Sequence, residues 1–199
     1  MKSVLISIQP YYVFLIIARL MGWNIPQDKT VEVRKDFPKD SAWNKVTHIY
    51  CSKSKKSFNK IPKEYQPLMA KMLGKVVGGF VCDKVEPLYI PVSNSATPPD
   101  KESVEKAICL SLGELKEYAA DKMFLFGWHV SDLKTYDKPK ELGEFTKPCP
   151  FPSEDCTDCP HMDWDYDTES DEEDSFCNNR ITRPPQSWMY IEEISNYGI

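Results

Sequence analysis

Residues 29–35 read Lys-Thr-Val-Glu-Val-Arg-Lys, and this stretch decides which fold the chain can adopt. Two valines alternate with polar residues at period two, which is the pattern of a β-strand with one apolar and one polar face. Thr30, Glu32 and Arg34 share the polar face, so an acid and a base stand side by side on it. This pair is either an exposed ion pair worth under about 1 kcal/mol or part of a site for a ligand with both hydrogen-bond donors and acceptors.

The segments around this strand predict a mixed fold. Runs rich in β-branched and aromatic residues predict strands at 4–8, 46–51, 75–85, 127–136 and 187–194. Helices are expected at 11–21, 63–73 and 100–109, and another after Ser111, which has the spacing of a capping box with Glu114. Gly78-Gly79 indicates a bulge or a close approach by another backbone. The order favours an α+β fold around a small, mostly antiparallel β-barrel with flanking helices.

Composition limits the classes of protein and partner. A chain of 199 residues with 41% hydrophobic and 28% charged residues fits one globular domain. Lys+Arg 25 against Asp+Glu 30 gives a net charge of −5, so a nucleic-acid site has to be a local patch, of which Lys53–Lys60 is the best candidate. The alternative for this stretch, which we expect, is a flexible, solvated lysine-rich loop. No apolar run is long enough for a membrane span, and a signal peptide does not fit the first residues. We therefore expect a cytoplasmic protein.

A cysteine-containing, acidic segment at 146–180 interrupts the pattern and predicts an insertion. Cys149, Cys156, Cys159 and Cys177 form the arrangement C-x6-C-x2-C-x17-C, and the twelve residues 163–174 include eight acids. The C-x2-C pair is typical of a structural Zn2+ site, with His161 as a reserve ligand. Four thiolates would leave no open position, so a catalytic zinc is not expected. The alternative is a solvated loop without metal.

Several blocks of the sequence resemble one known family. Residues 4–10 (VLISIQP), 29–34 (KTVEVR), 74–83 (GKVVGGFVCD), 127–139 (GWHVSDLKTYDKP) and 182–193 (TRPPQSWMYIEE) occur in the same order as in ASCH domains of the PUA-like superfamily. The similarity is to phage- and prophage-encoded members from Firmicutes. It implies a single ASCH domain over residues 1–199, with residues 146–180 as the insertion.

The resemblance also implies a PUA-like barrel with a cleft beside the first helix, where ASCH domains are thought to bind RNA or nucleotides. Carried over by position, Lys29 and Arg34 would be the cationic contacts and Glu32 the acceptor for an amino or hydroxyl group. The further candidates are Ser7 and Gln9 at the end of the first strand, and Trp128 and His129. Trp128 has core packing as its alternative, and His129 has a structural hydrogen bond.

Two other functions remain open at this stage. Some small members of the superfamily hydrolyse acylated cytidine-type nucleosides, and Lys29 matches their lysine. Their threonine nucleophile, three positions later, is replaced here by Glu32, so the catalytic residues are unknown and we expect binding rather than catalysis. The third possibility is a phage accessory protein whose acidic segment binds a host protein.

Overall fold

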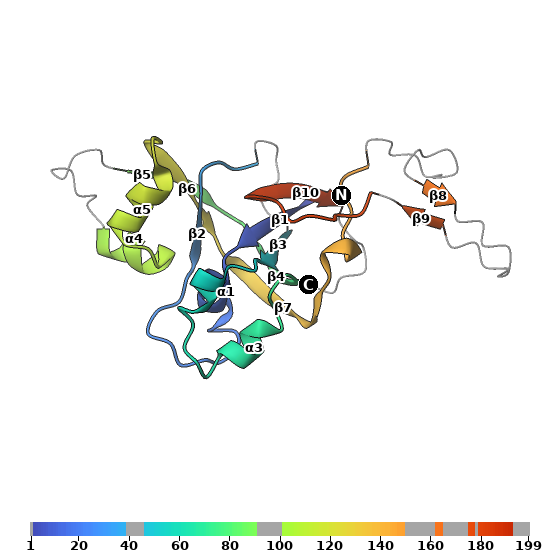
Figure 1. The fold of residues 1–199 in the computed structure, drawn as a ribbon. Helices are drawn as coiled ribbons and strands as arrows, with labels where there is room; N and C mark the ends of the chain where they lie inside the picture. Colours follow the sequence, from blue (N-terminus) through green and yellow to red (C-terminus); the bar gives the residue numbers. More distant parts are fainter. Residues whose placement is uncertain are drawn as a thin grey trace.

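A five-stranded sheet forms the centre of the molecule (Figure 1). The computed structural model describes residues 2–38, 46–90, 101–149, 162–164, 175–177 and 179–192. The sheet has the order β10-β1-β3-β4-β7, with the bounds β1 Lys2–Ile8, β3 Val46–Cys51, β4 Val76–Val81, β7 Ser131–Lys140 and β10 Trp188–Glu192. β1 is parallel to β3 and antiparallel to β10. The predicted first strand therefore lies inside the sheet, which fits its almost continuous burial.

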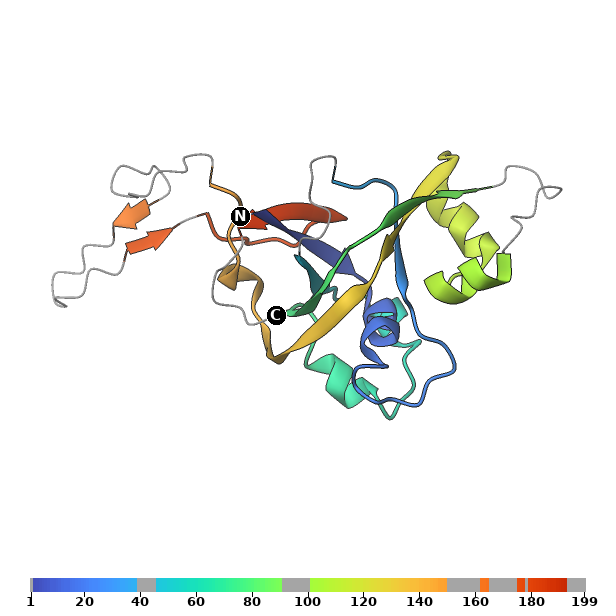
Figure 2. The same cartoon turned by 180° about the vertical axis from the view of Figure 1, so that it is seen from behind.

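A three-stranded antiparallel sheet, in the order β2-β6-β5, continues from the first. Its strands are β2 Val31–Arg34, β5 Val85–Tyr89 and β6 Phe124–His129. β5 follows β4 after three residues, and β6 precedes β7 with only Val130 between them. β4 and β5 thus form one long ribbon, and β6 and β7 form another. The two ribbons run beside each other through both sheets (Figure 2). The polar strand of the sequence is thus the edge of the smaller sheet.

The strands that the structure describes do not close into a barrel. Among the described residues, the hydrogen-bonded strands form two open sheets and a separate β8–β9 pair. β2 has four residues and pairs with β6 alone. The Arg34 side chain connects β2 to β1 and to the residue before β10, because it donates to the carbonyls of Ser7 and Ser187. The α+β class and the mostly antiparallel pairing are as predicted.

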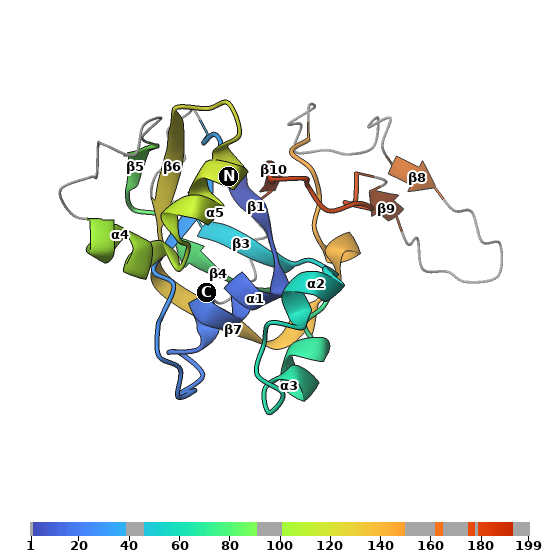
Figure 3. The ribbon, with the colours of Figure 1, turned by 60° about the vertical axis from the view of Figure 1, so that its left-hand side comes forward.

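Two groups of helices cover the sheets. α1 (Pro10–Ile17) is buried on several faces and packs in the main core with α2 (Lys55–Phe58) and α3 (Gln66–Ala70) nearby (Figure 3). α4 (Lys101–Ile108) and α5 (Leu112–Ala119) cover the β2-β6-β5 sheet and form a second core with Val31, Val33 and Leu125. The capping box predicted from Ser111 and Glu114 is present at the start of α5. A short 3-10 turn, Leu142–Glu144, follows β7.

The inserted segment is described only in part. β8 (Met162–Trp164) and β9 (Ser175–Cys177) pair antiparallel, on the side of the molecule away from α4 and α5 (Figure 1). The rest of the acidic run lies outside the described residues. The bounds of the insertion and its function therefore stay predictions.

Candidate functional site

Lys29, Glu32 and Arg34 converge and form a buried charged cluster. The Arg34 Nη2 atom lies 2.9 Å from Glu32 Oε1, and the Lys29 Nζ atom lies 3.5 Å from Glu32 Oε2. The three residues are only 3%, 6% and 6% exposed, in that order. An exposed ion pair, the simpler alternative from the sequence, is therefore excluded. Burying one carboxylate with two basic groups is costly unless each charge is hydrogen-bonded.

The Lys29 amine is held at the end of a helix. Its Nζ donates to the carbonyl of Ile108, the last residue of α4, at 2.6 Å, where a cation also compensates the negative end of the helix dipole. The Lys29 backbone N–H donates to the Leu15 carbonyl of α1, so the residue lies beside the first helix as expected. Burial lowers the pKa of the Lys29 amine, and the nearby Glu32 charge partly offsets this.

The pairing of β2 with β6 decides which aromatic side chain joins the cluster. Glu32 is opposite Trp128 and Val31 is opposite His129, so alternation puts Trp128 on the face of the cluster and His129 on the other face. Trp128 is 1% exposed and belongs to the main core, which is the position of a packed side chain. The His129 Nε2 atom instead lies 2.8 Å from Glu86 Oε1. The structure does not bring His129 into the cluster.

Ser7 and Gln9 flank the cluster with their backbone. The Ser7 carbonyl accepts a hydrogen bond from Arg34 Nη2 at 2.7 Å. Gln9 is exposed and precedes α1, where its carbonyl accepts from the N–H groups of Tyr12 and Val13. Ser7 thus positions the guanidinium, whereas Gln9 is exposed and contributes only its carbonyl to the start of α1.

Two N–H groups near the cluster are buried without an acceptor in the described part of the chain. They are Arg34 Nε and Trp128 Nε1. Each such donor costs about 1–3 kcal/mol when nothing accepts from it. A water molecule or a ligand oxygen at this face of β2 and β6 would remove that cost.

Five residues that sequence reasoning did not identify form the rim of the cluster: Tyr11, Tyr12, Lys60, Glu114 and Tyr118. The Tyr12 ring lies 5.2 Å from Lys29 Nζ, and burial, reinforced by Glu114 and Glu32, raises the pKa of Tyr12 to about 12. Tyr118 accepts Lys35 over its ring at 5.3 Å, and its pKa is raised by burial and held back by Arg34.

A sequence signal for part of this rim did exist. Glu114 and Tyr118 are four residues apart in α5, so they share one helix face. Leu115 and Ala119 share the adjacent face, which is buried in the second core. The tyrosines of α1 gave no such signal, because that helix is apolar almost all round.

A cavity of about 410 Å³ lies between the residues that precede β2 and the helix α4. Asp28, Thr30, Ser103 and Lys106 contribute polar groups to it, beside apolar Ile25, Pro26 and Ala107. Thr30 lines this cavity, whereas the Lys29 amine lies in the cluster with Glu32. The expected alternation, which would put Thr30 on the face of Glu32 and Arg34, therefore does not hold before β2 begins at Val31. The hydroxyl of Thr30 is therefore not placed to work with Lys29.

The predicted zinc ligands cannot be assembled from the described residues. Cys156 and Cys159 lie outside them, and only the backbone of Cys177 is described, in β9. The Cys149 N–H donates to Glu192 Oε1 at 3.1 Å. Within the described ranges, no group of three potential ligands comes together. The structural Zn2+ stays a prediction, which metal analysis of the purified protein would test.

Comparisons with known proteins give a distant structural likeness. No known family and no curated protein matches the sequence. Crystal structures of the ASCH protein from Zymomonas mobilis are similar: its wild type has a TM-score of 0.44 and 14% identity over 70% of this chain and 73% of that chain. Two point mutants of that protein have TM-scores of 0.45 and 14% identity, over 71% and 70% of this chain and 77% and 74% of theirs. No helix in the described ranges has the length and hydrophobicity of a membrane span.

Proposed function

We propose that this protein is an ASCH-type module that binds a nucleotide of RNA at the buried charged cluster. The observation that carries the proposal is the pair of buried N–H groups, Arg34 Nε and Trp128 Nε1, that find no acceptor among the described residues. Arg34 is paired with Glu32, and Trp128 is opposite Glu32 in the pairing of β2 with β6. A base carbonyl or phosphate oxygen would accept from them, and Glu32 would accept from an amino group or a sugar hydroxyl. A nucleotide offers both kinds of group.

The surplus of basic groups favours the same class of ligand. The cluster has two basic side chains for one carboxylate, so an anionic ligand is favoured over a cation there. The burial that lowers the pKa of Lys29 would be compensated by a phosphate. Access requires the rim to move, because the three charged side chains are buried, and the rings of Tyr12 and Tyr118 lie against Lys29 and Lys35. Their rings then provide faces on which a base can stack.

Nucleotide binding by conservative variants tests the proposal. Glu32→Gln keeps the shape of the side chain but replaces a carboxylate oxygen by an amide donor, and Arg34→Lys keeps the charge but removes the Nε donor. We expect each to weaken binding of RNA and of mononucleotides on the order of tenfold, which corresponds to about 1.4 kcal/mol. Titration calorimetry would measure this, and a thermal melt would show that each variant is folded.

Glu86→Gln is the matched control. Glu86 is a carboxylate of the same sheet, paired with Lys84 and His129 on the opposite face from the cluster. Its replacement should leave the affinity unchanged. Folded Glu32→Gln and Arg34→Lys proteins that bind as tightly as the wild type would refute the proposed site.

Hydrolysis of acylated or otherwise modified nucleosides is the second candidate. The observation in its favour is the buried Lys29 amine with a lowered pKa next to Glu32, because a lysine of this kind can act as a base. Against it, Thr30 faces the cavity on the other side. Release of free acid from acylated cytidines, abolished by Lys29→Met, would establish this activity. The absence of turnover by the wild type would remove it.

Phage or prophage origin and binding of a host protein through the acidic segment stay predictions from the sequence. Within residues 163–174 the structure describes only the backbone of Asp163 and Trp164, and the pattern of acids is the sole support. Deleting residues 165–174 and recovering the same partners from a host lysate would contradict this alternative.

A further inference from the structure

A lysine surface lies on the segment that connects β3 to β4. Residues 53–75 contain seven lysines and a single acidic residue, Glu64. Here the lysine surface means Lys53, Lys55, Lys56, Lys60, Lys63, Lys71 and Lys75. Six of these seven residues are exposed and Lys75 is half-buried. The strong positive charge of this segment contrasts with the net charge of −5 for the whole chain.

Most of these lysines have no anionic partner in the described part of the protein. Lys75 pairs with Glu141 at 2.8 Å, and Lys60 approaches Glu114 at 4.0 Å. None of the other five forms an ion pair with a described acidic side chain. Internal ion pairs therefore do not explain why the charges are concentrated here, and an external polyanion would meet them unneutralised.

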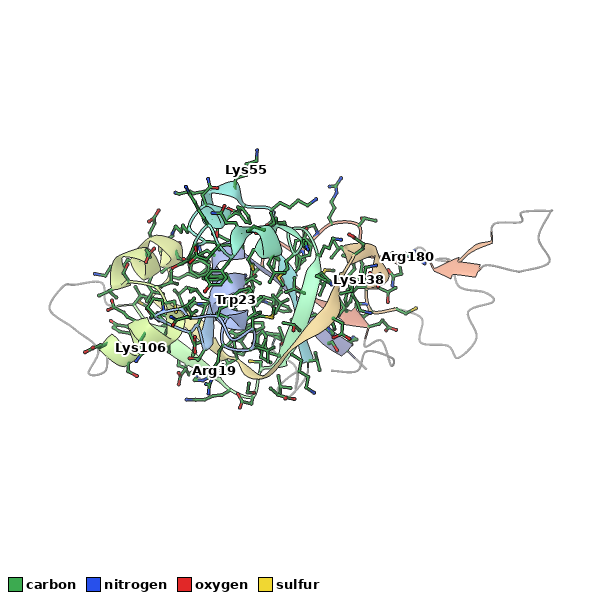
Figure 4. All side chains as sticks on the ribbon, turned by 90° about the horizontal axis from the view of Figure 1, so that it is seen from below. Arg19, Trp23, Lys55, Lys106, Lys138 and Arg180 are labelled. Atoms are coloured by element: carbon green, nitrogen blue, oxygen red, sulfur yellow. The ribbon has the colours of Figure 1, made fainter. Side chains whose placement is uncertain are left out.

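The segment is anchored firmly to the main core. The Ser57 hydroxyl of α2 accepts from the Tyr11 N–H of α1 at 3.1 Å, and Ser54 caps α2. Ile61, Met69 and Met72 are buried in the same cluster as α1. The helices α2 and α3 lie together next to α1 (Figure 3), and the Lys55 side chain extends outward from α2 (Figure 4). The lysine surface is therefore presented on a fixed scaffold.

A chain of contacts leads from the lysine surface to the charged cluster. Lys60 Nζ lies 5.7 Å from the centre of the Tyr11 ring, and the Tyr11 and Tyr12 rings are 5.7 Å apart. Tyr12 in turn lies against Lys29. The exposed cations thus continue, through two aromatic rings, into the proposed nucleotide site.

From this continuity we infer that the lysine surface binds the phosphodiester backbone of single-stranded RNA, one nucleotide of which enters the charged cluster. The inference rests on the proposed function and specifies its ligand as a polynucleotide. A mononucleotide has too few phosphates to engage five unpaired lysines. A single strand is required because a base has to leave the stack to pass the tyrosines and to stack on them. An acidic peptide would pair with the lysine side chains but would not stack on the tyrosine rings.

Separate changes to the lysine surface and to an equal number of other lysines test the inference. The probes are a labelled RNA of about 12 nucleotides and the four ribonucleoside 5′-monophosphates. In the triple variant Lys55→Gln, Lys56→Gln and Lys63→Gln, we expect RNA affinity to fall on the order of tenfold. The dependence of log K on log salt should become shallower by up to about 2, since each phosphate contact on a single strand contributes about 0.7. Mononucleotide binding should be unchanged.

The control is the triple variant Lys122→Gln, Lys138→Gln and Lys147→Gln, which changes net charge equally at exposed positions outside the lysine surface. Figure 4 places Lys138 along β7, away from Lys55. Equal loss of RNA binding in both triple variants would overturn the inference, as would wild-type affinity and salt slope in the first. Equally tight binding of poly-L-glutamate would also overturn it, because the surface would then lack selectivity for RNA.

A failure of the proposed function would give other binding results than a failure of this inference. If the cluster variants Glu32→Gln and Arg34→Lys bind RNA normally while the lysine-surface variant does not, the cluster is not the nucleotide site and the inferred path into it is wrong. If the wild type binds mononucleotides but the lysine-surface variant loses no RNA affinity, the proposed function stands and only the inference fails.

Discussion

At the scale of single residues, Arg34 connects the polar strand β2 to two neighbouring parts of the main sheet. Its guanidinium joins the Glu32 carboxylate of β2 to the Ser7 carbonyl of β1 and the Ser187 carbonyl before β10. Removing one partner of a buried pair leaves an uncompensated charge, which costs more than removing both. The side chain therefore matters for stability as well as for ligand binding.

We predict that Arg34→Ala destabilises the fold by about 3–5 kcal/mol, because Glu32 is left buried with only the Lys29 amine beside it. The double variant Glu32→Leu, Arg34→Met should cost clearly less than the single one, since it removes both charges. Urea denaturation of the single and double variants would measure both free energies. A single variant that loses less than about 1 kcal/mol would show that the charge is solvated.

The sequence predicted part of this site and could not predict the rest. Period two along the strand correctly made Glu32 and Arg34 neighbours. The burial of the cluster could not be predicted from the sequence. The carbonyl groups that accept from Lys29 and Arg34 belong to Ile108 and Ser187, which are far away in the sequence. Alternation also separates Trp128 from His129, so two adjacent candidates could never both have faced the same cleft.

At the scale of elements, β4 and β7 approach each other unusually closely at Gly78. A Cβ atom there would lie 2.2 Å from the Lys134 carbonyl oxygen and 2.8 Å from the Thr135 Cα atom. The pairing of β4 with β7 shifts register around this glycine. The predicted bulge or close backbone approach at Gly78-Gly79 is therefore confirmed.

Gly78→Ala should lower the free energy of unfolding by about 1–3 kcal/mol, because the added methyl group meets backbone that cannot rotate away. Gly113→Ala in α5 is the comparison, since a Cβ there meets only the Ser111 hydroxyl at 3.9 Å. Alanine should stabilise that helix by up to about 1 kcal/mol. Thermal or chemical denaturation would compare the two, and equal effects would contradict the steric account.

The short elements β5 and α2 were not predicted from the sequence. β5 contains Pro87, which usually argues against a strand but is tolerated in this edge strand. α2 spans four residues of a lysine-rich stretch that was expected to be a loop. Its stability comes from Ser54 and from the contact of Ser57 with α1, and neither can be seen in local propensity.

At the scale of the whole molecule, acid stability should depend on a buried histidine. His48 on β3 is 5% exposed, and its Nδ1 atom lies 2.6 Å from the Tyr136 hydroxyl of β7. Burial lowers the pKa of His48 to about 4, from an ordinary value of 6.5. Between these values the unfolded chain binds a proton that the folded protein does not, so stability rises with pH across this window.

We predict that acidification from pH 6.5 to pH 4 costs the wild type up to about 3 kcal/mol more than it costs His48→Gln. The variant has no titrating group at this position, whereas the carboxylates titrate alike in both proteins. Free energies of unfolding measured at several pH values would show the difference. Parallel curves for the two proteins would mean that His48 is solvated in the folded state.

The α+β fold class could be predicted from the sequence more readily than the closure of the sheet into a barrel. Strand and helix patterns gave an α+β fold, which the structure has. Whether a curved sheet closes depends on the pairing of its first and last strands, and β2 is too short to supply that pairing. The acidic insertion was recognisable from composition, while most of it lies outside the described residues.

The close succession of β4 and β5, and of β6 and β7, across the two sheets has a consequence for folding. The two sheets cannot choose their alignments independently, since the paired segments β4–β5 and β6–β7 supply two strands to each sheet. A slip of one residue between these two segments would turn Leu125 out of its core and Trp128 out of the other at the same time. Misaligned chains thus lose two cores at once, which makes a slip of one residue costly for the whole molecule.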